Sequence, residues 1–258
     1  MPIKGIEGNN CDLCEECIKE CPMGNYSKSN GKIVFDTSKR CILCGHCIAV
    51  CQTDAIIYED MKDIAFNFDD ITETLSFNAI YKLLRSKRSI RQYKNKKVPK
   101  EVIEKIINCI RYAPTAMNKR SLKCLVISDD QKINEFIDSI IKAIEEDEDR
   151  ELYKKKREKG IDPFFHKAPH ILILHSNNKW DNTNATIAIT YAMLGAETLG
   201  MGSCWIGGVQ IFLNEKKQIM KNLFGIEDEI YGIMIFGYPK VKYFRAPPRP
   251  PIEIHFIT

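Results

Sequence analysis

The sequence lacks several features that would assign it quickly to a class. Its 258 residues contain no apolar run near the length that spans a bilayer. Its first residues, Met1-Pro-Ile-Lys-Gly-Ile-Glu, lack the long apolar core of a signal peptide. It has no P-loop and no G-x-G-x-x-G after a strand, which disfavours those nucleotide sites. The lack of a membrane-length apolar run and of a signal-peptide core predicts a cytoplasmic protein that does not insert into membranes.

Cysteine, in contrast, is concentrated in one region. Eight of the eleven cysteines form two runs of C-x2-C-x2-C-x3-C, the first followed by Pro22 and the second by Gln52. In this bacterial iron–sulfur spacing the fourth cysteine of each run ligates the other cluster. We predict two [4Fe–4S] clusters: cluster 1 on Cys11, Cys14, Cys17 and Cys51, and cluster 2 on Cys41, Cys44, Cys47 and Cys21.

Zinc and disulfides are the competing interpretations of these cysteines. Structural zinc usually takes two tight pairs separated by a longer loop, and disulfides are uncommon in the cytosol. Residues 1–60 resemble a two-cluster bacterial ferredoxin. Gln52 departs from that pattern, which has proline there, and this puts the geometry of the loop in question. The remaining cysteines, Cys109, Cys124 and Cys204, have apolar neighbours and are expected to be buried.

Charge is divided unevenly along the chain. The net charge is +4, but residues 1–60 carry −3 and the remainder +7. A basic second part suits an anionic cofactor, docking of an acidic electron-carrier protein, or nucleic acid. No stripe of interleaved basic and aromatic residues is present, so we predict no nucleic-acid binding.

The pattern of residues predicts two domains. Residues 1–60 form the cluster domain, 61–77 an ordered connector and 78–258 a second domain. In the first domain, strands are expected at 31–36 and 55–58, paired with each other. The connector is not Gly/Ser-rich, which disfavours a floppy tether.

Hydrophobic runs and helical periodicity alternate in the second domain. The charged run 145–159 is expected to be a solvated helix or a mobile excursion. The helix at 181–199 is rich in alanine, which permits close packing, including against a second copy of the chain. The proline-rich tail 245–251 excludes regular helix. Other helices are expected from Phe77, at 98–110, 133–144 and 214–223 (capped by Asn214), with strands at 123–128, 170–175 and 230–236.

Basic and hydroxyl groups gather in Lys87-Arg88-Ser89-Ile90-Arg91, and Arg245 and Arg249 lie far away in the sequence. Guanidinium groups with a hydroxyl suit a phosphate monoester. From chemistry alone, a solvated basic surface fits this segment equally well.

Four segments, in order, resemble FMN-dependent nitroreductase-type oxidoreductases over residues 78–258. Residues 87–91 resemble the family's R-R-S-x-R, and 113–118 resemble A-P-S-x-x-N. Residues 200–208 resemble G-L-G-x-x-W-I-G, and Gly237-Tyr-Pro239 with Arg249 matches the family's G-Y-P and late arginine. Residues 119–122 depart from the family's Q-P-W, which leaves the choice of substrate open.

The resemblance implies an α+β protein: a small ferredoxin-like domain, then a three-layer α/β/α domain with a mostly antiparallel central sheet. It implies a homodimer with FMN at the subunit interface. No residue is assigned as catalytic, because the flavin carries the chemistry. Arg88, Ser89, Arg91 and Arg249 would hold the phosphate and pyrimidine edge, Asn118 the flavin ring, and the Gly207–Gly208 backbone would approach flavin N5, with Lys87 and Arg245 as weaker candidates.

These features predict an oxidoreductase that passes electrons from two clusters to FMN and on to an organic acceptor, such as a nitroaromatic or quinone. One alternative keeps the fold and uses NAD(P)H as donor, or serves dehalogenation or flavin breakdown. Another is a redox sensor or electron store without catalysis. His166, His170 and His175 are candidate proton donors, although a structural role is expected of such histidines.

Overall fold

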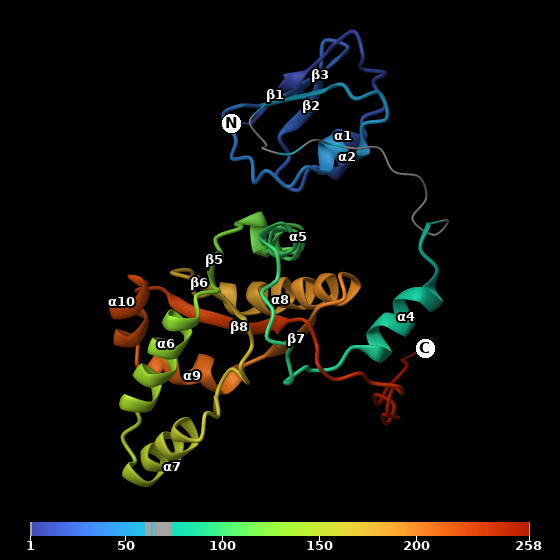
Figure 1. The fold of residues 1–258 in the computed structure, drawn as a ribbon. Helices are drawn as coiled ribbons and strands as arrows, with labels where there is room; N and C mark the ends of the chain where they lie inside the picture. The colour runs from blue at the N-terminus through green and yellow to red at the C-terminus, as the bar shows by residue number, and fades with distance from the viewer. Residues whose placement is uncertain (1, 60–62, 64, 66–73, 258) are drawn as a thin grey trace. The chain divides into compact units, whose positions relative to one another are not determined.

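The computed structural model describes residues 2–59, 63, 65 and 74–257 (Figure 1). The chain divides into two compact units. Unit 1 comprises Met1–Thr74 with Ala116–Lys119, and unit 2 comprises Leu75–Thr115 with Arg120–Thr258. Most of the predicted connector 61–77 lies outside the described residues.

Unit 1 contains two small antiparallel pairs. Strand β1 (Ile3–Ile6) pairs with β4 (Ile56–Tyr58), and β2 (Tyr26–Ser29) pairs with β3 (Lys32–Phe35). The predicted pairing of 31–36 with 55–58 is therefore wrong. The reason is local, because Asn30 and Gly31 both have positive φ (49° and 71°) and form a two-residue hairpin turn.

The chain of unit 1 repeats itself with an offset of 30 residues. Helix α1 (Glu16–Glu20) is preceded by Glu15 at φ 63°, and α2 (His46–Val50) by Gly45 at φ 78°. The residues two before these, Leu13 and Leu43, also have left-handed φ, at 62° and 56°. Each half of the repeat therefore builds the same loop, followed by a helix of five residues.

Unit 2 is built on one antiparallel sheet in the order β5-β6-β8-β7. The strands are β5 (Lys123–Ile127), β6 (His170–Ser176), β8 (Glu229–Gly237) and β7 (Gly202–Trp205). All of β6 is buried, as expected of a strand covered on both faces. Strand β7 lies within the glycine-rich segment 200–208, where the sequence analysis expects no strand.

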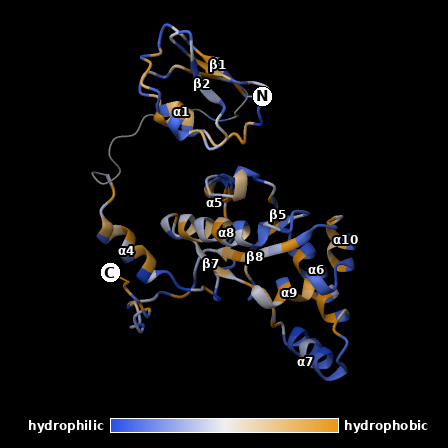
Figure 2. Cartoon of the chain, turned by 180° about the vertical axis from the view of Figure 1, so that it is seen from behind, coloured by the Kyte–Doolittle hydropathy of each residue, from blue (hydrophilic) through white to orange (hydrophobic). Residues whose placement is uncertain are grey.

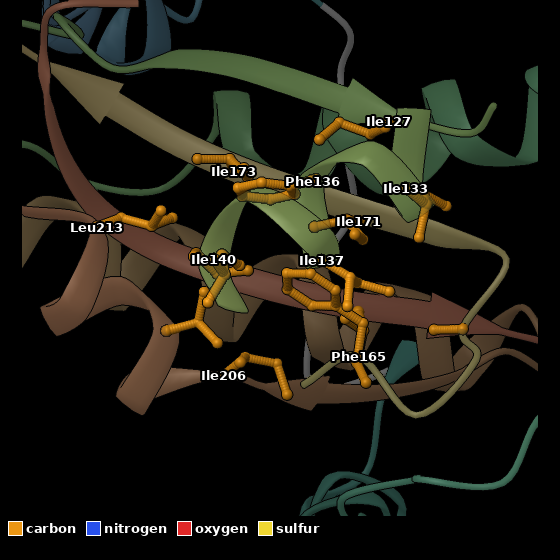
Figure 3. Packing of buried hydrophobic residues seen from close by; sticks show 14 of the residues in the cluster. Ile127, Ile133, Phe136, Ile137, Ile140, Phe165, Ile171, Ile173, Ile206 and Leu213 are labelled. Carbon is orange, nitrogen blue, oxygen red and sulfur yellow. The ribbon is translucent and has the colours of Figure 1, made fainter. Parts of the chain in front are cut away.

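Successive residues of β6 enter two different hydrophobic cores. Ile171 and Ile173 pack with Phe136 in the first core (Figure 3), and Leu172 and Leu174 belong to the second. This alternation places a helical layer on each face and confirms the predicted three-layer α+β architecture. The helices are α4 (Phe77–Ser86), α5 (Lys100–Arg111), α6 (Asp130–Lys142), α7 (Asp147–Glu158), α8 (Asp181–Thr198), α9 (Gly207–Glu215) and α10 (Gln218–Phe224), and a short 3₁₀ turn spans Ala116–Asn118.

The single helix predicted at 214–223 is wrong. The structure has α9 and α10, separated at Lys216 and Lys217. Asn214 does not cap a helix. Its side-chain amide donates to the Ile230 carbonyl (2.8 Å) and its Oδ1 accepts from the Ile230 N–H (2.8 Å), which ties α9 to β8.

The charged run forms a solvated helix, α7, which has no buried residue and is mostly hydrophilic in Figure 2. Arg157 attaches it to α6 through Asp138 (3.0 Å) and Asn134 (2.9 Å).

The cysteines outside unit 1 differ from one another. Cys204 is buried as predicted, but Cys109 is half-buried and Cys124 is exposed. A Cβ added to Gly195 would lie 2.5 Å from Cys109 Sγ, so this glycine lets α8 approach α5 closely. The small residues of α8 thus serve packing within the chain. No helix among the described residues is long and apolar enough to cross a membrane.

Candidate cluster and flavin sites

Unit 1 contains two cavities, and four cysteines line each one. Cys21, Cys41, Cys44 and Cys47 line the first, while Cys11, Cys14, Cys17 and Cys51 line the second. Each cavity takes three cysteines from one run and the last cysteine from the other. These are the two sets that the spacing predicts for cluster 2 and cluster 1.

Backbone N–H groups point at the sulfurs of both sets. Ala55 N–H donates to Cys51 Sγ (3.2 Å), and Asn25 N–H donates to Cys21 Sγ (3.3 Å) at the equivalent place in the repeat. Leu43 N–H donates to Cys41 Sγ (3.4 Å). Such bonds stabilise thiolates that carry the negative charge of a cluster.

Gln52 does not change the loop that it occupies. Cys51, before Gln52, has φ −80° and ψ 103°, and Cys21, before Pro22, has φ −78° and ψ 106°. The two loops have the same backbone conformation. Proline is therefore unnecessary for this geometry.

Each cavity presents four thiols, which is the number of protein ligands of one [4Fe–4S] cluster. Among the described residues, no three His, Cys, Asp or Glu side chains gather closely enough to share one metal ion.

Two buried groups indicate what these cavities must receive. Burial, reinforced by the neighbouring Cys11 and Cys14, raises the pKa of the Cys17 thiol to about 11. Without a cluster this thiol is protonated at neutral pH, so cluster binding must displace its proton. The hydroxyl of Tyr26 is buried beside Cys47 and has no hydrogen-bond partner of acceptable geometry among the described residues. A sulfur acceptor inside the cavity would satisfy it.

In unit 2, the basic segment 87–91 follows α4 and lies along β7. Ser89 bridges to Ser203, and Ile90 N–H donates to the Ser203 carbonyl (3.0 Å). Lys87 Nζ donates to the same carbonyl (3.1 Å) and to that of Arg88 (2.7 Å). Lys87 is thus largely used in fixing this segment to the sheet.

Two buried polar atoms on this segment and its partner strand have no hydrogen-bond partner among the described residues: Arg88 Nε and Ser203 Oγ. The outer nitrogens of Arg88 donate to the Lys87 carbonyl and to the Arg85 carbonyl (2.7 Å). A buried donor without an acceptor is costly, by about 1–3 kcal/mol. An oxygen-rich group bound here would satisfy both atoms. Sequence analysis missed Ser203, although its place within segment 200–208 was a signal.

The glycines near β7 are explained by different structural requirements. A Cβ on Gly202 would lie 2.6–2.8 Å from Ile90, so packing of segment 87–91 requires this glycine. Gly207 and Gly208 begin α9, and a Cβ on Gly208 would meet nothing within 4 Å. Neither packing nor positive φ explains Gly208, which is consistent with a planar ligand approaching the backbone.

The remaining predicted flavin residues are dispersed. Arg91 and Arg249 are exposed. Arg245 lines a pocket with Arg85 of α4. Asn118 belongs to unit 1, where its side-chain amide donates to the carbonyls of Ile42 (2.9 Å) and Leu43 (2.7 Å). The structure therefore brings together Lys87, Arg88 and Ser89, with Ser203 added to them.

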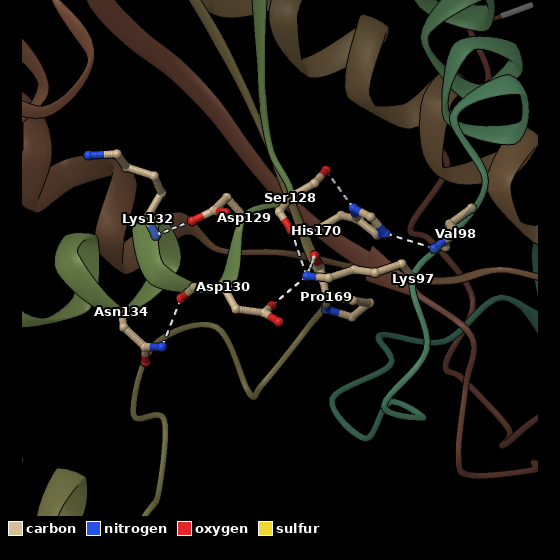
Figure 4. A network of polar contacts seen from close by, with 9 residues as sticks. All are labelled: Lys97, Val98, Ser128, Asp129, Asp130, Lys132, Asn134, Pro169 and His170. Carbon is tan, nitrogen blue, oxygen red and sulfur yellow. Dashed lines mark hydrogen bonds and ion pairs between the residues drawn. The ribbon is translucent and has the colours of Figure 1, made fainter.

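His170 and His175 have structural partners. The Val98 N–H donates to His170 Nε2 (2.9 Å), and His170 Nδ1 is 2.7 Å from Ser128 Oγ (Figure 4). Burial, aided by the charge of Lys97, lowers the pKa of His170 to about 4. His175 Nδ1 is bonded to Asp228 (2.7 Å). Burial also lowers the pKa of His166.

Comparison with known proteins decides the family. Residues 84–238 match the model of the nitroreductase family. The chain belongs to the nitroreductase family. Residues 10–56 match a 4Fe-4S dicluster domain, which confirms the predicted fusion of a ferredoxin domain to a nitroreductase domain and the assignment as an oxidoreductase.

Individual relatives match one part or the other of this nitroreductase. An uncharacterized ferredoxin of Methanocaldococcus jannaschii is 44% identical over 22% of the chain, and the match covers 40% of that ferredoxin. A putative NADH dehydrogenase/NAD(P)H nitroreductase of Archaeoglobus fulgidus is 26% identical over 62% of the chain and 84% of the relative. A corresponding protein of Methanothermobacter thermautotrophicus is 23% identical over 62% of the chain and 77% of the relative.

Solved structures share the fold of unit 2. A nitroreductase with bound FMN from Bacteroides fragilis has a TM-score of 0.53 at 24% identity, covering 67% of this chain and 98% of its own. One with bound FMN from Desulfitobacterium hafniense has a TM-score of 0.55 at 18% identity, covering 69% and 97%.

Proposed function

We propose that this nitroreductase passes electrons from two [4Fe–4S] clusters to FMN and on to an organic acceptor of the nitroaromatic or quinone kind. The observation that carries the proposal is the pair of cavities, each lined by four cysteines from both runs, in the same chain as a nitroreductase domain. A chain with such a module can accept electrons one at a time. The flavin, when bound, supplies the two-electron chemistry.

The cluster ligands in this proposal are the two sets of cavity cysteines. Cys11, Cys14, Cys17 and Cys51 hold cluster 1, and Cys21, Cys41, Cys44 and Cys47 hold cluster 2. Cluster potentials range from about −700 to +450 mV. Because each 59 mV is about tenfold in a one-electron equilibrium, a low-potential cluster reduces flavin almost completely.

The flavin residues in this proposal are centred on segment 87–91 and β7. Arg88 Nε and Ser203 Oγ, both buried, would donate to oxygens of FMN, with Ser89 beside them. The open backbone at Gly208 would face the ring. Four further residues remain candidates for binding FMN: Arg91, Arg245, Arg249 and Asn118. Lys87 contributes less, because its ammonium group already donates to backbone carbonyls.

We further propose that the protein is a homodimer. Its exposed apolar side chains gather on α4 and on the C-terminal segment, including Phe77 (76% exposed), Phe244 (82%) and Phe256 (83%). Large exposed apolar groups of this kind mark interaction surfaces. A second copy would cover them, and sedimentation analysis tests this directly: a monomer at micromolar concentration contradicts the proposal.

Composition of the purified protein tests the cofactor part. Anaerobically purified protein should contain FMN and about eight irons per chain, since two [4Fe–4S] clusters are present. A control with Cys14 and Cys44 changed to alanine should lose iron and retain FMN. Protein with fewer than about eight irons per chain, or without flavin, contradicts the proposal.

NAD(P)H as electron donor is the second candidate, because two relatives carry the name NADH dehydrogenase/NAD(P)H nitroreductase. Mixing the oxidised protein with NADH under argon separates the two. Prompt bleaching of the flavin favours nicotinamide as donor, and no bleaching on the timescale of turnover favours electron entry through the clusters.

A further inference from the structure

The two cluster cavities are related by the 30-residue repeat, but their linings differ at the equivalent positions. Tyr26 lines the cluster 2 cavity, and Ile56 occupies the same place in the cluster 1 cavity. Both side chains are 5% exposed. The repeat therefore places one hydroxyl beside cluster 2 and none at the corresponding point beside cluster 1.

The hydroxyl of Tyr26 is buried beside the Cys47 thiol and has no hydrogen-bond partner of acceptable geometry among the described residues. Its ring is held in place by Phe35 across the β2–β3 pair, with ring centroids 5.0 Å apart. A buried hydroxyl is rarely left without a well-formed hydrogen bond, because water cannot replace it. With cluster 2 bound, the acceptor beside the Tyr26 hydroxyl would be the Cys47 thiolate or a sulfide of the cluster.

Hydrogen bonds to its sulfurs stabilise a cluster when an electron adds negative charge, so they raise its reduction potential. Backbone donors already favour cluster 2, which has Asn25 and Leu43 N–H bonds to Cys21 and Cys41. Within the described part of the chain, cluster 1 has one such bond, from Ala55 N–H to Cys51 Sγ (3.2 Å). An exposed hydroxyl, that of Thr53, lies 3.7 Å from Cys51 Sγ, where water competes with it.

Charge acts in the same direction. Asp12, Glu15 and Glu16 line the cluster 1 cavity, and Ile42, Gly45 and His46 stand at the equivalent positions around cluster 2. Lys28 pairs with Glu15 (2.5 Å) and Lys19 with Glu16 (2.6 Å), which largely neutralises those two carboxylates. Asp12 has no cation partner among the described residues, and a nearby negative charge lowers the potential of a cluster.

We propose that the Tyr26 hydroxyl donates a hydrogen bond to a sulfur of cluster 2 and makes cluster 2 the more oxidising of the two. With both clusters bound, this difference would favour transfer of an electron from the cluster held by Cys11, Cys14, Cys17 and Cys51 to the one held by Cys21, Cys41, Cys44 and Cys47. Tyr26 acts through cluster 2 and is therefore a positioning residue. This inference rests on the proposed cluster assignment.

Redox titration of the holoprotein, followed by electron paramagnetic resonance, tests the proposal. The variant Tyr26→Phe keeps the ring and removes only the hydroxyl. We expect the more positive of the two cluster potentials to fall by about 59 mV, equivalent to about a tenfold change in the one-electron equilibrium. The matched control, Thr53→Val, removes the exposed hydroxyl beside Cys51 and should leave that potential unchanged. Movement of neither potential, or only of the more negative one, overturns the proposal.

A second measurement does not depend on the size of the shift. In the reduced wild-type protein, electron–nuclear double resonance should detect an exchangeable hydrogen coupled to the more positive cluster, and Tyr26→Phe should remove its signal. An identical spectrum of the variant overturns the proposal. Iron content is measured on the same samples. Fewer than about eight irons per wild-type chain contradicts the proposed loading, whereas full loading with unmoved potentials contradicts the Tyr26 inference alone.

Discussion

The two units of the chain differ in what holds them together. Among the described residues, the hydrophobic core of unit 1 has seven buried members, and two of them, Cys17 and Cys47, are proposed cluster ligands. Unit 2 has two cores, one on each face of its sheet, with nineteen and fifteen buried residues. A core as small as that of unit 1 cannot offset the entropy of ordering some sixty residues. Metal ligation must supply the difference, whereas unit 2 is stable through its packing.

The cluster loops reinforce this difference. Leu13 and Glu15 have left-handed backbone conformations that cost non-glycine residues about 1–3 kcal/mol each. A loop in that conformation is stable only when other interactions fix it. In unit 1 we propose that those interactions are bonds from cysteine to iron.

The largest expected effect is therefore the loss of the clusters. Removing iron with a chelator under reducing conditions should abolish hydrogen-exchange protection throughout residues 2–59 and leave β6 and β8 protected. Exchange measured peptide by peptide checks both units in one sample. Persistent protection of β1–β4 without iron contradicts the proposed role of ligation.

Truncation of a buried side chain in unit 2 should have the opposite effect: it should destabilise unit 2 and leave the clusters bound. Phe136 is fully buried and packs on Phe165 with ring centroids 5.3 Å apart. Phe136→Ala should lower the free energy of unfolding of unit 2 by about 3–5 kcal/mol while the iron content stays the same. Denaturant titration followed by far-UV circular dichroism measures the first quantity. The exposed residue Leu152 of α7 supplies the control, because Leu152→Ala should change this free energy little.

Acid should destabilise unit 2 through His170. Its pKa is lowered from 6.5 to about 4 in the folded protein, so the unfolded chain binds a proton more readily. Stability is complete above about pH 6.5 and falls as the pH approaches 4, by at most about 3 kcal/mol. Thermal melts of wild type and His170→Gln between pH 7 and 4.5 measure this. Parallel curves for the two proteins contradict the assignment.

The smallest expected effect comes from Gly202, whose packing against segment 87–91 should be required for FMN binding. Gly202→Ala places a Cβ against Ile90 and should displace segment 87–91, costing about 1–3 kcal/mol. The dissociation constant for FMN should be about tenfold or more higher for this variant. Gly225→Ala, at the end of α10, is the control and should keep wild-type affinity for FMN. Equal flavin dissociation constants for wild type and Gly202→Ala contradict the location of the site.

Much of this organisation could be predicted from the sequence, because spacing alone defines a cluster module. The cysteine spacing indicated the two crossed ligand sets, helical periodicity indicated α5 and α6, and an alanine-rich segment indicated α8. Strand pairing in unit 1 was predicted wrongly because the Asn30-Gly31 turn was overlooked. The helix expected from Asn214 was wrong because the tertiary bonds of this residue to Ile230 replaced a cap.

The site residues that were missed are those whose roles depend on burial. Tyr26 and Ser203 have ordinary side chains, and nothing in their local pattern indicates an orphaned hydroxyl. Cys124 was expected to be buried because its neighbours are apolar, but it lies on an exposed part of β5. Such properties arise from packing between segments distant in the sequence.

Electron transfer between the two kinds of cofactor is the most direct test of the proposed function. The protein is mixed anaerobically with a reduced low-potential ferredoxin, and the absorption of clusters and flavin is followed in time. In wild type the flavin should be reduced rapidly, and in the Cys14→Ala, Cys44→Ala variant, loaded with FMN, this phase should be lost. Equal rates of flavin reduction in both proteins would contradict the account.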